Sequence, residues 1–242
     1  AQQIGADPFV SVNIGSGTPR EAAEWLEYLT SAQPTTLAQE RAANGRAEPW
    51  TIPFLGLGNE SWDCGGNMTP EAYVGEMKRY ARFARNYHPA QQESGKMLRI
   101  AVGPGGDEPR FTAWTEAVMQ AWKDRKWSWD IEGLSLHHYT VLDWEKKHVA
   151  TGFGLREYAE ILHATRKMDA IIAQHTAIMD RYDPEKKLLL AVDEWGAWYA
   201  PAAGTNPGFL SQQNSLRDAL LAAINLNIFA RHAERVRMAH IA

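Results

Sequence analysis

The sequence lacks several features that would assign it to common functional classes. Cys64 is its only cysteine, so a disulfide within the chain and a metal site made of several cysteines are both excluded. No segment approaches the roughly 18 consecutive apolar residues that a membrane-spanning helix needs. The net charge of −4 gives no electrostatic reason to expect nucleic acid or an anionic membrane as a partner.

The N-terminus also lacks an initiator methionine and a signal-peptide pattern. We therefore expect the 242 residues to be a fragment of a longer protein or an incomplete record of one. The compartment stays open between bacterial cytoplasm, periplasm and secretion, because any signal peptide would precede Ala1. No linker or internal repeat separates a second domain.

Apolar strands alternate with amphipathic helices, which predicts an α/β fold with a parallel sheet covered by helices. The chain holds five clear strands and a sixth, truncated candidate, whereas a complete (β/α)8 barrel has eight. We expect strands at 9–14, 51–58, 98–103, 131–137, 188–194 and 236–241, and helices at 20–29, 69–87, 111–123, 154–182 and 210–232. This pattern fits either part of a larger barrel or an open sheet.

Glu60 follows an apolar strand in the run FLGLGNE at 54–60. Barrel enzymes build their sites at the carboxyl ends of strands, and an acid there can protonate a leaving oxygen while the adjacent Asn59 orients a substrate hydroxyl. The structural alternative is a turn with a surface ion pair. Trp62, two residues later, is a candidate for sugar contact, although most tryptophans in any protein lie in the core.

Glu194 ends the run LLLAVDE at 188–194, which offers no polar face and is expected to be covered on both sides. Strand alternation turns one of Asp193 and Glu194 inward, and we favour Glu194, with a structural role for Asp193. The aromatic loop that begins at Trp195 is predicted to contact a sugar. Alternatively, the strand simply exits into solvent at these two acids.

The strand at 131–137 runs into LHHYT, whose His137 and Tyr139 can hydrogen-bond a catalytic carboxylate or the substrate. Adjacent histidines on a strand point to opposite faces, so His137 and His138 do not form a metal pair, and neither metal nor cofactor is expected. Asn13 is a further strand-end amide with a turn as its alternative role. Cys64, close behind Glu60, is not expected to act as a nucleophile.

These motifs together resemble the α-L-arabinofuranosidases of glycoside hydrolase family 51. The resemblance extends over the whole chain and is carried by GLGNESW at 56–62, CGGNM at 64–68, LHHYT at 136–140 and VDEWG at 192–196. Further matching segments are 13–18, 41–45, 48–50, 210–213 and 217–219. The family fold is a (β/α)8 barrel, of which the chain would hold about strands three to eight. The first two strands and the C-terminal β-sandwich domain of the family are missing from the sequence.

The resemblance implies that Glu60 is the acid/base and Glu194 the nucleophile of a retaining glycosidase. Asn59 would bind the sugar hydroxyl next to the anomeric carbon, and His137 and Tyr139 would line the site and orient the nucleophile. A retaining mechanism predicts carboxyl groups about 5–5.5 Å apart, against roughly 6.5–9.5 Å for inversion. The family also implies a homo-oligomer, often a hexamer.

The expected activity is exo-hydrolysis of terminal α-L-arabinofuranosyl groups from arabinoxylan or arabinan side chains, a step in hemicellulose degradation. One alternative keeps the barrel and both glutamates but changes the sugar, to a β-xylosidase or an endo-β-glucanase. The other is a non-catalytic carbohydrate-binding protein, in which replacing either glutamate would barely change affinity. If the protein is an arabinofuranosidase, its expected partners are arabinose-containing oligosaccharides or polysaccharides.

Overall fold

The structure of the protein is a computed structural model that describes residues 1–93, 96–126 and 129–241. The chain divides into two compact units. The N-terminal unit consists of Ala1–Gly103 and Ala113–Ser135, and the C-terminal unit consists of Pro104–Thr112 and Leu136–Ala242.

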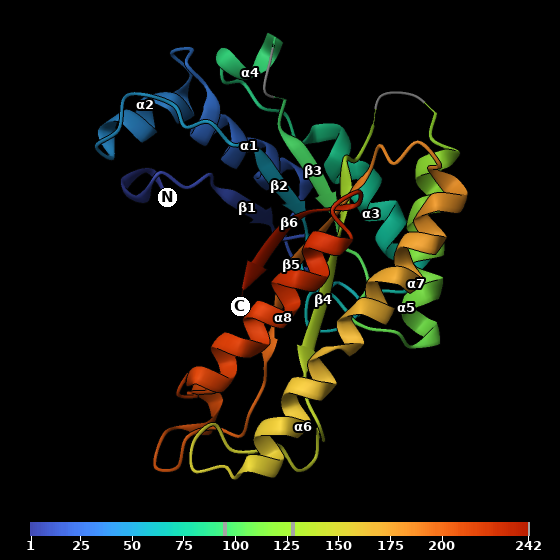
Figure 1. The fold of residues 1–242 in the computed structure, drawn as a ribbon. Coiled ribbons are helices and arrows are strands. Elements are labelled where there is room, and N and C mark those ends of the chain that lie inside the picture. Colours follow the sequence, from blue (N-terminus) through green and yellow to red (C-terminus); the bar gives the residue numbers. More distant parts are fainter. Residues whose placement is uncertain (94–95, 127–128, 242) are drawn as a thin grey trace. The chain divides into compact units, whose positions relative to one another are not determined.

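Three parallel strands and the start of a fourth form the sheet of the N-terminal unit (Figure 1). They are in register, since Phe9 lies opposite Phe54 and Phe54 opposite Leu98, and Ile100 pairs with Gly133 at the start of the fourth strand. The strands are β1 (Phe9–Val12), β2 (Phe54–Leu57), β3 (Leu98–Ala101) and the first residues of β4 (Gly133–Thr140). The helices are η1 (Gln2–Ile4), α1 (Pro19–Thr30), α2 (Thr36–Ala43), α3 (Pro70–Phe83), α4 (Ala90–Glu93) and most of α5 (Pro109–Lys123).

Side-chain caps fix where α1 and α3 begin. Thr18 accepts a hydrogen bond from the backbone of Glu21, whose carboxylate accepts one from the backbone of Thr18, which is a capping box. Thr69 caps α3 through the backbone N–H of Ala72, and a proline stands at the first position of both helices. Both starts agree with the sequence-based expectation.

Tyr73 on α3 ties the ends of two strands together. Its buried hydroxyl donates to the carbonyl of Leu57 at 2.9 Å and accepts from the N–H of Val102 at 2.6 Å. Its ring stacks on Trp114 with the centroids 4.9 Å apart. The helix therefore holds the carboxyl ends of β2 and β3 in place with both packing and hydrogen bonds, just before the loops that follow these strands.

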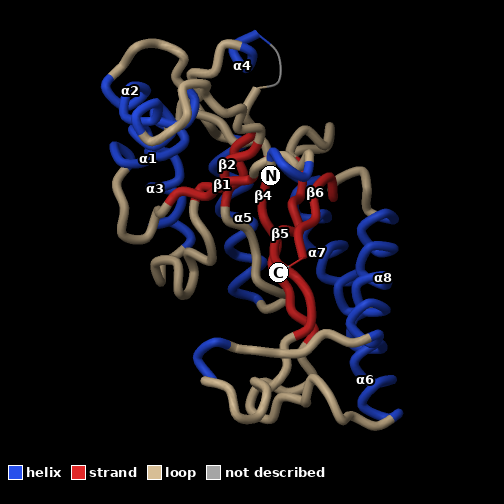
Figure 2. The backbone as a smooth tube through the Cα atoms, turned by 90° about the vertical axis from the view of Figure 1, so that its left-hand side faces the viewer, coloured by secondary structure: helices blue, strands red, loops and turns tan. Residues whose placement is uncertain are grey.

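The C-terminal unit contains the rest of β4 and two further strands, with α8 packed against both of them (Figure 2). Strands β5 and β6 are parallel, and Leu190 pairs with Val236. The elements are α6 (Leu155–Thr165), α7 (Lys167–Tyr182), β5 (Leu189–Ala197), η2 (Pro207–Phe209), α8 (Leu216–Arg231) and β6 (Val236–Ile241). Helix α8 also packs on α6.

The core of this unit includes the first half of β5, whose residues up to Val192 are at most 5% exposed. Burial of both faces explains the continuous apolar run, because a parallel strand covered by helices has no solvent side. Each fully buried leucine stabilises the fold by roughly 1.5–3 kcal/mol. The polar residues Asp193 and Glu194 interrupt this run only near its carboxyl end.

The strands follow the order β1-β2-β3-β4-β5-β6 in the sheet, and the described pairings are parallel. This confirms the predicted fold class, an α/β chain with the strand pattern of an incomplete (β/α)8 barrel. Within the described residues, no helix combines the length and apolarity required to cross a bilayer.

Several element boundaries differ from the sequence-based expectation. Helix α2 forms in a stretch expected to be irregular, and the expected helix at 154–182 is two helices that meet at Arg166. At the end of α6 the hydroxyl of Thr165 bonds back to the carbonyl of Ile161. Strand β5 continues three residues beyond Glu194, to Ala197.

Candidate active site

Glu60 sits in a sharp turn after β2. Gly58 and Glu60 both have left-handed backbone conformations, with φ of 98° and 42°. A side chain at position 58 would place its Cβ 2.4 Å from Cγ2 of Ile14, so only glycine fits. A left-handed glutamate costs roughly 1–3 kcal/mol, and such strain concentrates at functional positions. The turn places Glu60 just beyond the carboxyl end of β2.

The loop after Glu60 folds back onto it. The backbone N–H groups of Asp63 and Gly65 donate to the carbonyl of Glu60 at 2.8 and 3.0 Å. A Cβ at position 65 would lie 1.6 Å from the carbonyl oxygen of Asn59, which makes a glycine obligatory at this close approach.

Folding back brings Cys64 to the carboxylate of Glu60. Its Sγ lies 3.4 Å from Oε2 of Glu60 and donates a hydrogen bond to it. Burial, followed by this hydrogen bond and the charge of Glu60, raises the pKa of the Cys64 thiol above its ordinary value. The thiol therefore stays protonated near neutral pH and remains a donor to Glu60. Sequence reasoning placed Cys64 in this loop but did not anticipate the contact.

The other predicted residues of the N-terminal unit differ in their surroundings. Asn59 is exposed. The amide of Asn13 donates to the hydroxyl of Ser16 and accepts from its backbone N–H, at 2.8 and 3.0 Å, which favours the turn role considered for it. Trp62 is half-buried, and its indole N–H donates to the carbonyl of Gly103 at 3.0 Å.

In the C-terminal unit, the ends of β4 and β5 bring three predicted residues together. The hydroxyl of Tyr139 donates to Oε1 of Glu194 at 2.9 Å, and Nδ1 of His137 lies 3.4 Å from Oε2 of the same carboxylate. His137 is buried, whereas the side chain of Glu194 retains 26% of its exposure. Glu194 thus has a polar neighbour at each carboxylate oxygen and is still accessible.

Asp193 lies on the other side of the same imidazole, with its Oδ1 3.2 Å from Nε2 of His137. Strict alternation would send two consecutive side chains of a strand to opposite faces, but the register between β5 and β6 shifts between Val192 and Trp195. Such a bulge re-aims side chains, and it explains why both acids approach one histidine. Asp193 is the less exposed of the two, consistent with the structural role predicted for it.

The aromatic residues after Glu194 divide into core and surface. Trp195 is 2% exposed and packs edge-on against Phe229 of α8 at 5.1 Å, which favours a structural role for this ring. Trp198 instead packs edge-on against Tyr139 at 5.0 Å, and Trp144 packs against Trp198 at 5.7 Å. Trp144 is 57% exposed.

The rings of Tyr139, Trp198 and Trp144 thus form a row of edge-on contacts that begins at the tyrosine bonded to Glu194. Trp198 lies in the aromatic loop that is predicted from the sequence to contact a sugar, whereas sequence reasoning missed Trp144. The sequence feature that could have identified Trp144 is its position as an aromatic residue in the polar loop directly after the LHHYT segment.

His138 faces a different environment from His137. Burial, and then the nearby charge of Lys167, lower the pKa of His138 to about 4, while Asp107 opposes this shift. Lys167 and Asp107 form an ion pair of 2.9 Å. His138 is therefore neutral near pH 7, and the two adjacent histidines serve opposite faces of β4, as expected from alternation.

Comparisons with known proteins agree with the motifs. The family described as "Alpha-L-arabinofuranosidase 1 domain" matches residues 3–120, and the family described as "Alpha-L-arabinofuranosidase C-terminal domain" matches residues 193–242. The chain is 39% identical to a protein of Bacteroides ovatus named intracellular exo-alpha-L-arabinofuranosidase, over 100% of this chain and 45% of that protein.

Two solved structures extend the comparison to the fold. A family 51 arabinofuranosidase from Xanthomonas axonopodis pv. citri superimposes with a TM-score of 0.91 at 47% identity, over 100% of this chain and 46% of that one. The Thermotoga maritima alpha-L-arabinofuranosidase, solved as an arabinose complex, gives a TM-score of 0.68 at 27% identity, over 100% and 44%. The chain thus spans less than half the length of these relatives, and it belongs to the α-L-arabinofuranosidases of glycoside hydrolase family 51.

Proposed function

We propose that the protein is a retaining exo-α-L-arabinofuranosidase in which Glu194 is the nucleophile and Glu60 the acid/base. The observation that carries the proposal is the double contact of Glu194 with Tyr139 and His137. A surface carboxylate needs no such partners, whereas a nucleophile must be held in one orientation for attack. The names of the protein's relatives support arabinofuranose as the sugar.

In the first step Glu194 attacks the anomeric carbon of an α-L-arabinofuranoside and forms a glycosyl ester. Glu60, protonated at the start, transfers its proton to the departing oxygen, so that the alcohol leaves neutral. The hydrogen bond from Tyr139 occupies Oε1 of Glu194 and orients the carboxylate for attack.

In the second step Glu60, now ionised, removes a proton from water, which attacks the anomeric carbon and releases arabinose with its configuration retained. The thiol of Cys64 donates a hydrogen bond to Oε2 of Glu60 and stabilises this ionised form. Asn59, exposed beside Glu60, is proposed to bind the sugar hydroxyl next to the anomeric carbon.

The proposed substrates are terminal α-L-arabinofuranosyl groups on arabinoxylan or arabinan side chains. The exo assignment is supported by the names of two relatives, from Bacteroides ovatus and Bifidobacterium longum, the latter named an intracellular exo-alpha-(1->5)-L-arabinofuranosidase. We further propose a homo-oligomer, which light scattering of the full-length protein tests.

The test is nitrophenol release from aryl α-L-arabinofuranoside, β-D-xyloside and β-D-glucoside by the full-length protein and its Glu60→Ala and Glu194→Ala variants. The proposal requires arabinofuranoside turnover that is lost in both variants, with azide restoring part of it in Glu194→Ala. Turnover of only the xyloside or the glucoside would be compatible with the two glutamates as the catalytic pair but would contradict the proposed substrate. Unchanged activity in Glu194→Ala would overturn the mechanism.

A further inference from the structure

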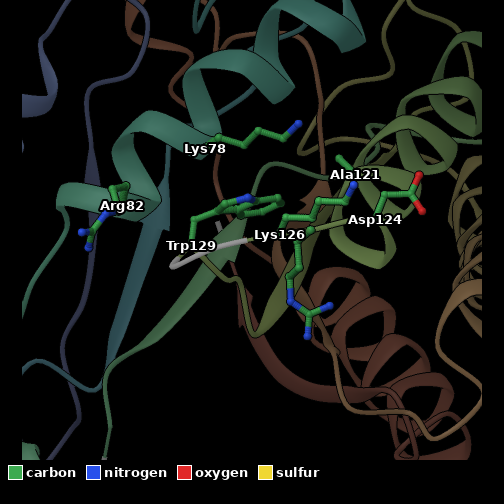
Figure 3. A pocket seen from close by; sticks show the side chains of 7 residues that line it. Lys78, Arg82, Ala121, Asp124, Lys126 and Trp129 are labelled. Carbon is green, nitrogen blue, oxygen red and sulfur yellow. The ribbon is translucent and has the colours of Figure 1, made fainter.

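A hollow of about 520 Å³ lies on the N-terminal unit and is lined by the last turns of α3, by the end of α5 with the three residues that follow it, and by Trp129 (Figure 3). Its volume is within the about 300–1,000 Å³ of small-molecule sites. The side chains that define its chemistry are Lys78, Arg82, Asp124, Arg125, Lys126 and Trp129. None of them takes part in the proposed reaction.

The hollow is strongly basic on a chain whose net charge is −4. Four cationic side chains line it. One of them, Arg125, forms an ion pair with Asp130, with 3.1 Å between Nε and Oδ1, and its Cζ lies 4.3 Å from the centroid of the Trp122 ring. Among the residues that the structure describes, no carboxylate pairs with Arg82 or Lys126, and both are exposed. Unpaired cations in a hollow favour an anionic ligand.

An aromatic ring lies among these cations. Trp129 is half-buried, and Nζ of Lys78 lies 5.6 Å from its ring centroid. Figure 3 shows the indole between the side chains of Lys78 and Lys126, with Arg82 on one side and Asp124 on the other. An indole packs well against the apolar face of a ring, while the flanking ammonium groups bind a charged substituent on it.

The position of the hollow decides what kind of anion it fits. Lys78 and Arg82 lie in the last two turns of α3, and α5 ends at Lys123, next to Asp124. Helix C-termini carry partial negative charge and present no free N–H groups, whereas phosphate sites use helix N-termini. A singly charged carboxylate is therefore favoured over a phosphate.

A nucleic acid is also disfavoured, because its binding domains are basic as a whole and present a continuous stripe of cations. This chain has an isoelectric point of about 6.1, which is far from that of a basic domain. The ligand that fits these observations has a ring that can pack on Trp129 and one carboxylate that can bind between Lys78 and Lys126.

We propose that this hollow is a secondary saccharide site that binds a uronic acid residue, the sugar that carries one carboxylate on its ring. The choice of a saccharide rests on the proposed function, and the unpaired cations of the hollow select a sugar that bears a carboxylate. Lys78 and Lys126 bind the carboxylate, and Trp129 contacts the sugar ring. The site would hold acidic polymers on the enzyme without contacting the bond that is cleaved.

Calorimetric titration of the full-length protein with trigalacturonate tests this site, with the methyl ester of the same trisaccharide as the uncharged counterpart. Trigalacturonate is expected to bind at least about tenfold more tightly than the ester, which corresponds to about 1.4 kcal/mol. The double variant Lys78→Glu/Lys126→Glu is expected to lose at least tenfold in affinity. The variant Arg20→Glu/Lys187→Glu, which changes net charge equally at exposed positions elsewhere, is expected to bind as the unmodified protein does.

Equal binding of trigalacturonate and its ester, equal loss of affinity in both double variants, or full displacement by the same concentration of acetate would each overturn the proposal. Release of nitrophenol from aryl α-L-arabinofuranoside is measured on the same samples. Turnover without uronate binding would contradict this inference alone. Uronate binding that the lysine variant abolishes, without turnover, would uphold the site and contradict the proposed function.

Discussion

The hydroxyl of Tyr139 donates a 2.9 Å hydrogen bond to Oε1 of Glu194, from a residue 55 positions earlier in the chain. The two residues stand near the ends of β4 and β5, and Trp198 packs edge-on against the tyrosine ring. A bond to an ionised acceptor is worth about 1.5–3 kcal/mol. Tyr139 is therefore the group that most directly fixes the orientation of the proposed nucleophile.

Tyr139→Phe removes this hydrogen bond and keeps the ring. We expect kcat on aryl arabinofuranoside to fall about 10- to 100-fold, with a much smaller change in KM, because the bond orients the attacking group. Far-ultraviolet circular dichroism should match the unmodified protein, which shows that the fold is kept. A kcat within twofold of the unmodified protein would show that Glu194 does not depend on Tyr139.

Cys64 offers a test of the proposed acid/base. Its thiol stabilises the ionised form of Glu60, so Cys64→Ala should make Glu60 harder to ionise and move the alkaline limb of the pH–activity profile to higher pH. Cys64→Ser keeps a donor and should leave the limb closer to its original position. If both variants give the original profile, the thiol does not influence the group that sets this limb.

The sequence predicts the sheet well because parallel strands are buried on both faces and therefore appear as apolar runs. The last strand has the expected bounds, and the Thr-Pro starts of α1 and α3 are visible as caps. Helix α2 was missed because it is short and only two of its residues, Ala38 and Arg41, are buried; the side chain of Arg41 donates to four backbone carbonyls. Tertiary hydrogen bonds of that kind leave no periodic pattern.

The position of Glu60 just after a strand was predictable from its motif, and the family resemblance implied the pairing of His137 and Tyr139 with Glu194, although β5 continues beyond that residue to Ala197. The bulge that brings Asp193 and Glu194 to the same histidine was not predictable, because strict alternation is the only rule that a single strand offers. The contact of Cys64 with Glu60 depends on a left-handed turn at a glutamate, a conformation that residue type does not indicate.

Arg217 joins two loops of the C-terminal unit. Its guanidinium is buried between the rings of Phe153 and Tyr199, 3.8 and 4.1 Å from their centroids, and donates to the carbonyls of Val149 and Ala150 at 3.1 and 3.3 Å. Its Nε and Nη1 find no hydrogen-bond partner among the described residues. We therefore expect the stacking between the two rings to contribute more to stability than the charge does.

We expect Arg217→Lys to lower the free energy of unfolding by about 2–4 kcal/mol, because a compact ammonium loses both the stacking and the fork of donors. Arg217→Met, which fills the space between the rings without burying a charge, should cost less. Urea unfolding of both variants measures the difference. The opposite order, with methionine the worse substitution, would mean that the charge itself stabilises the fold.

His138 makes stability depend on pH. Its pKa is about 4 in the folded protein and about 6.5 in an unfolded chain, so the unfolded state takes up the proton first as the pH falls. The stabilisation is complete above about pH 6.5 and is lost as the pH falls towards 4, by about 3 kcal/mol at most. Lys167 and Asp107 are the charged groups that act on this imidazole.

His138→Gln removes this titration. Its free energy of unfolding should fall less steeply between pH 7 and 5 than that of the unmodified protein, with a difference of about 2 kcal/mol across the interval. Chemical unfolding at both pH values measures the slopes. Parallel slopes would mean that His138 titrates alike in the folded and unfolded states.

The most direct test of the account is to identify the residue that carries the sugar between the two steps. The Glu60→Ala variant of the full-length protein, mixed with an aryl α-L-arabinofuranoside that has a good leaving group, should accumulate the glycosyl ester, because no base then activates the water. Peptide mass spectrometry should find one arabinosyl group on Glu194. An arabinosyl group on Asp193 or any other residue, or turnover with inverted configuration and no adduct, would contradict the account.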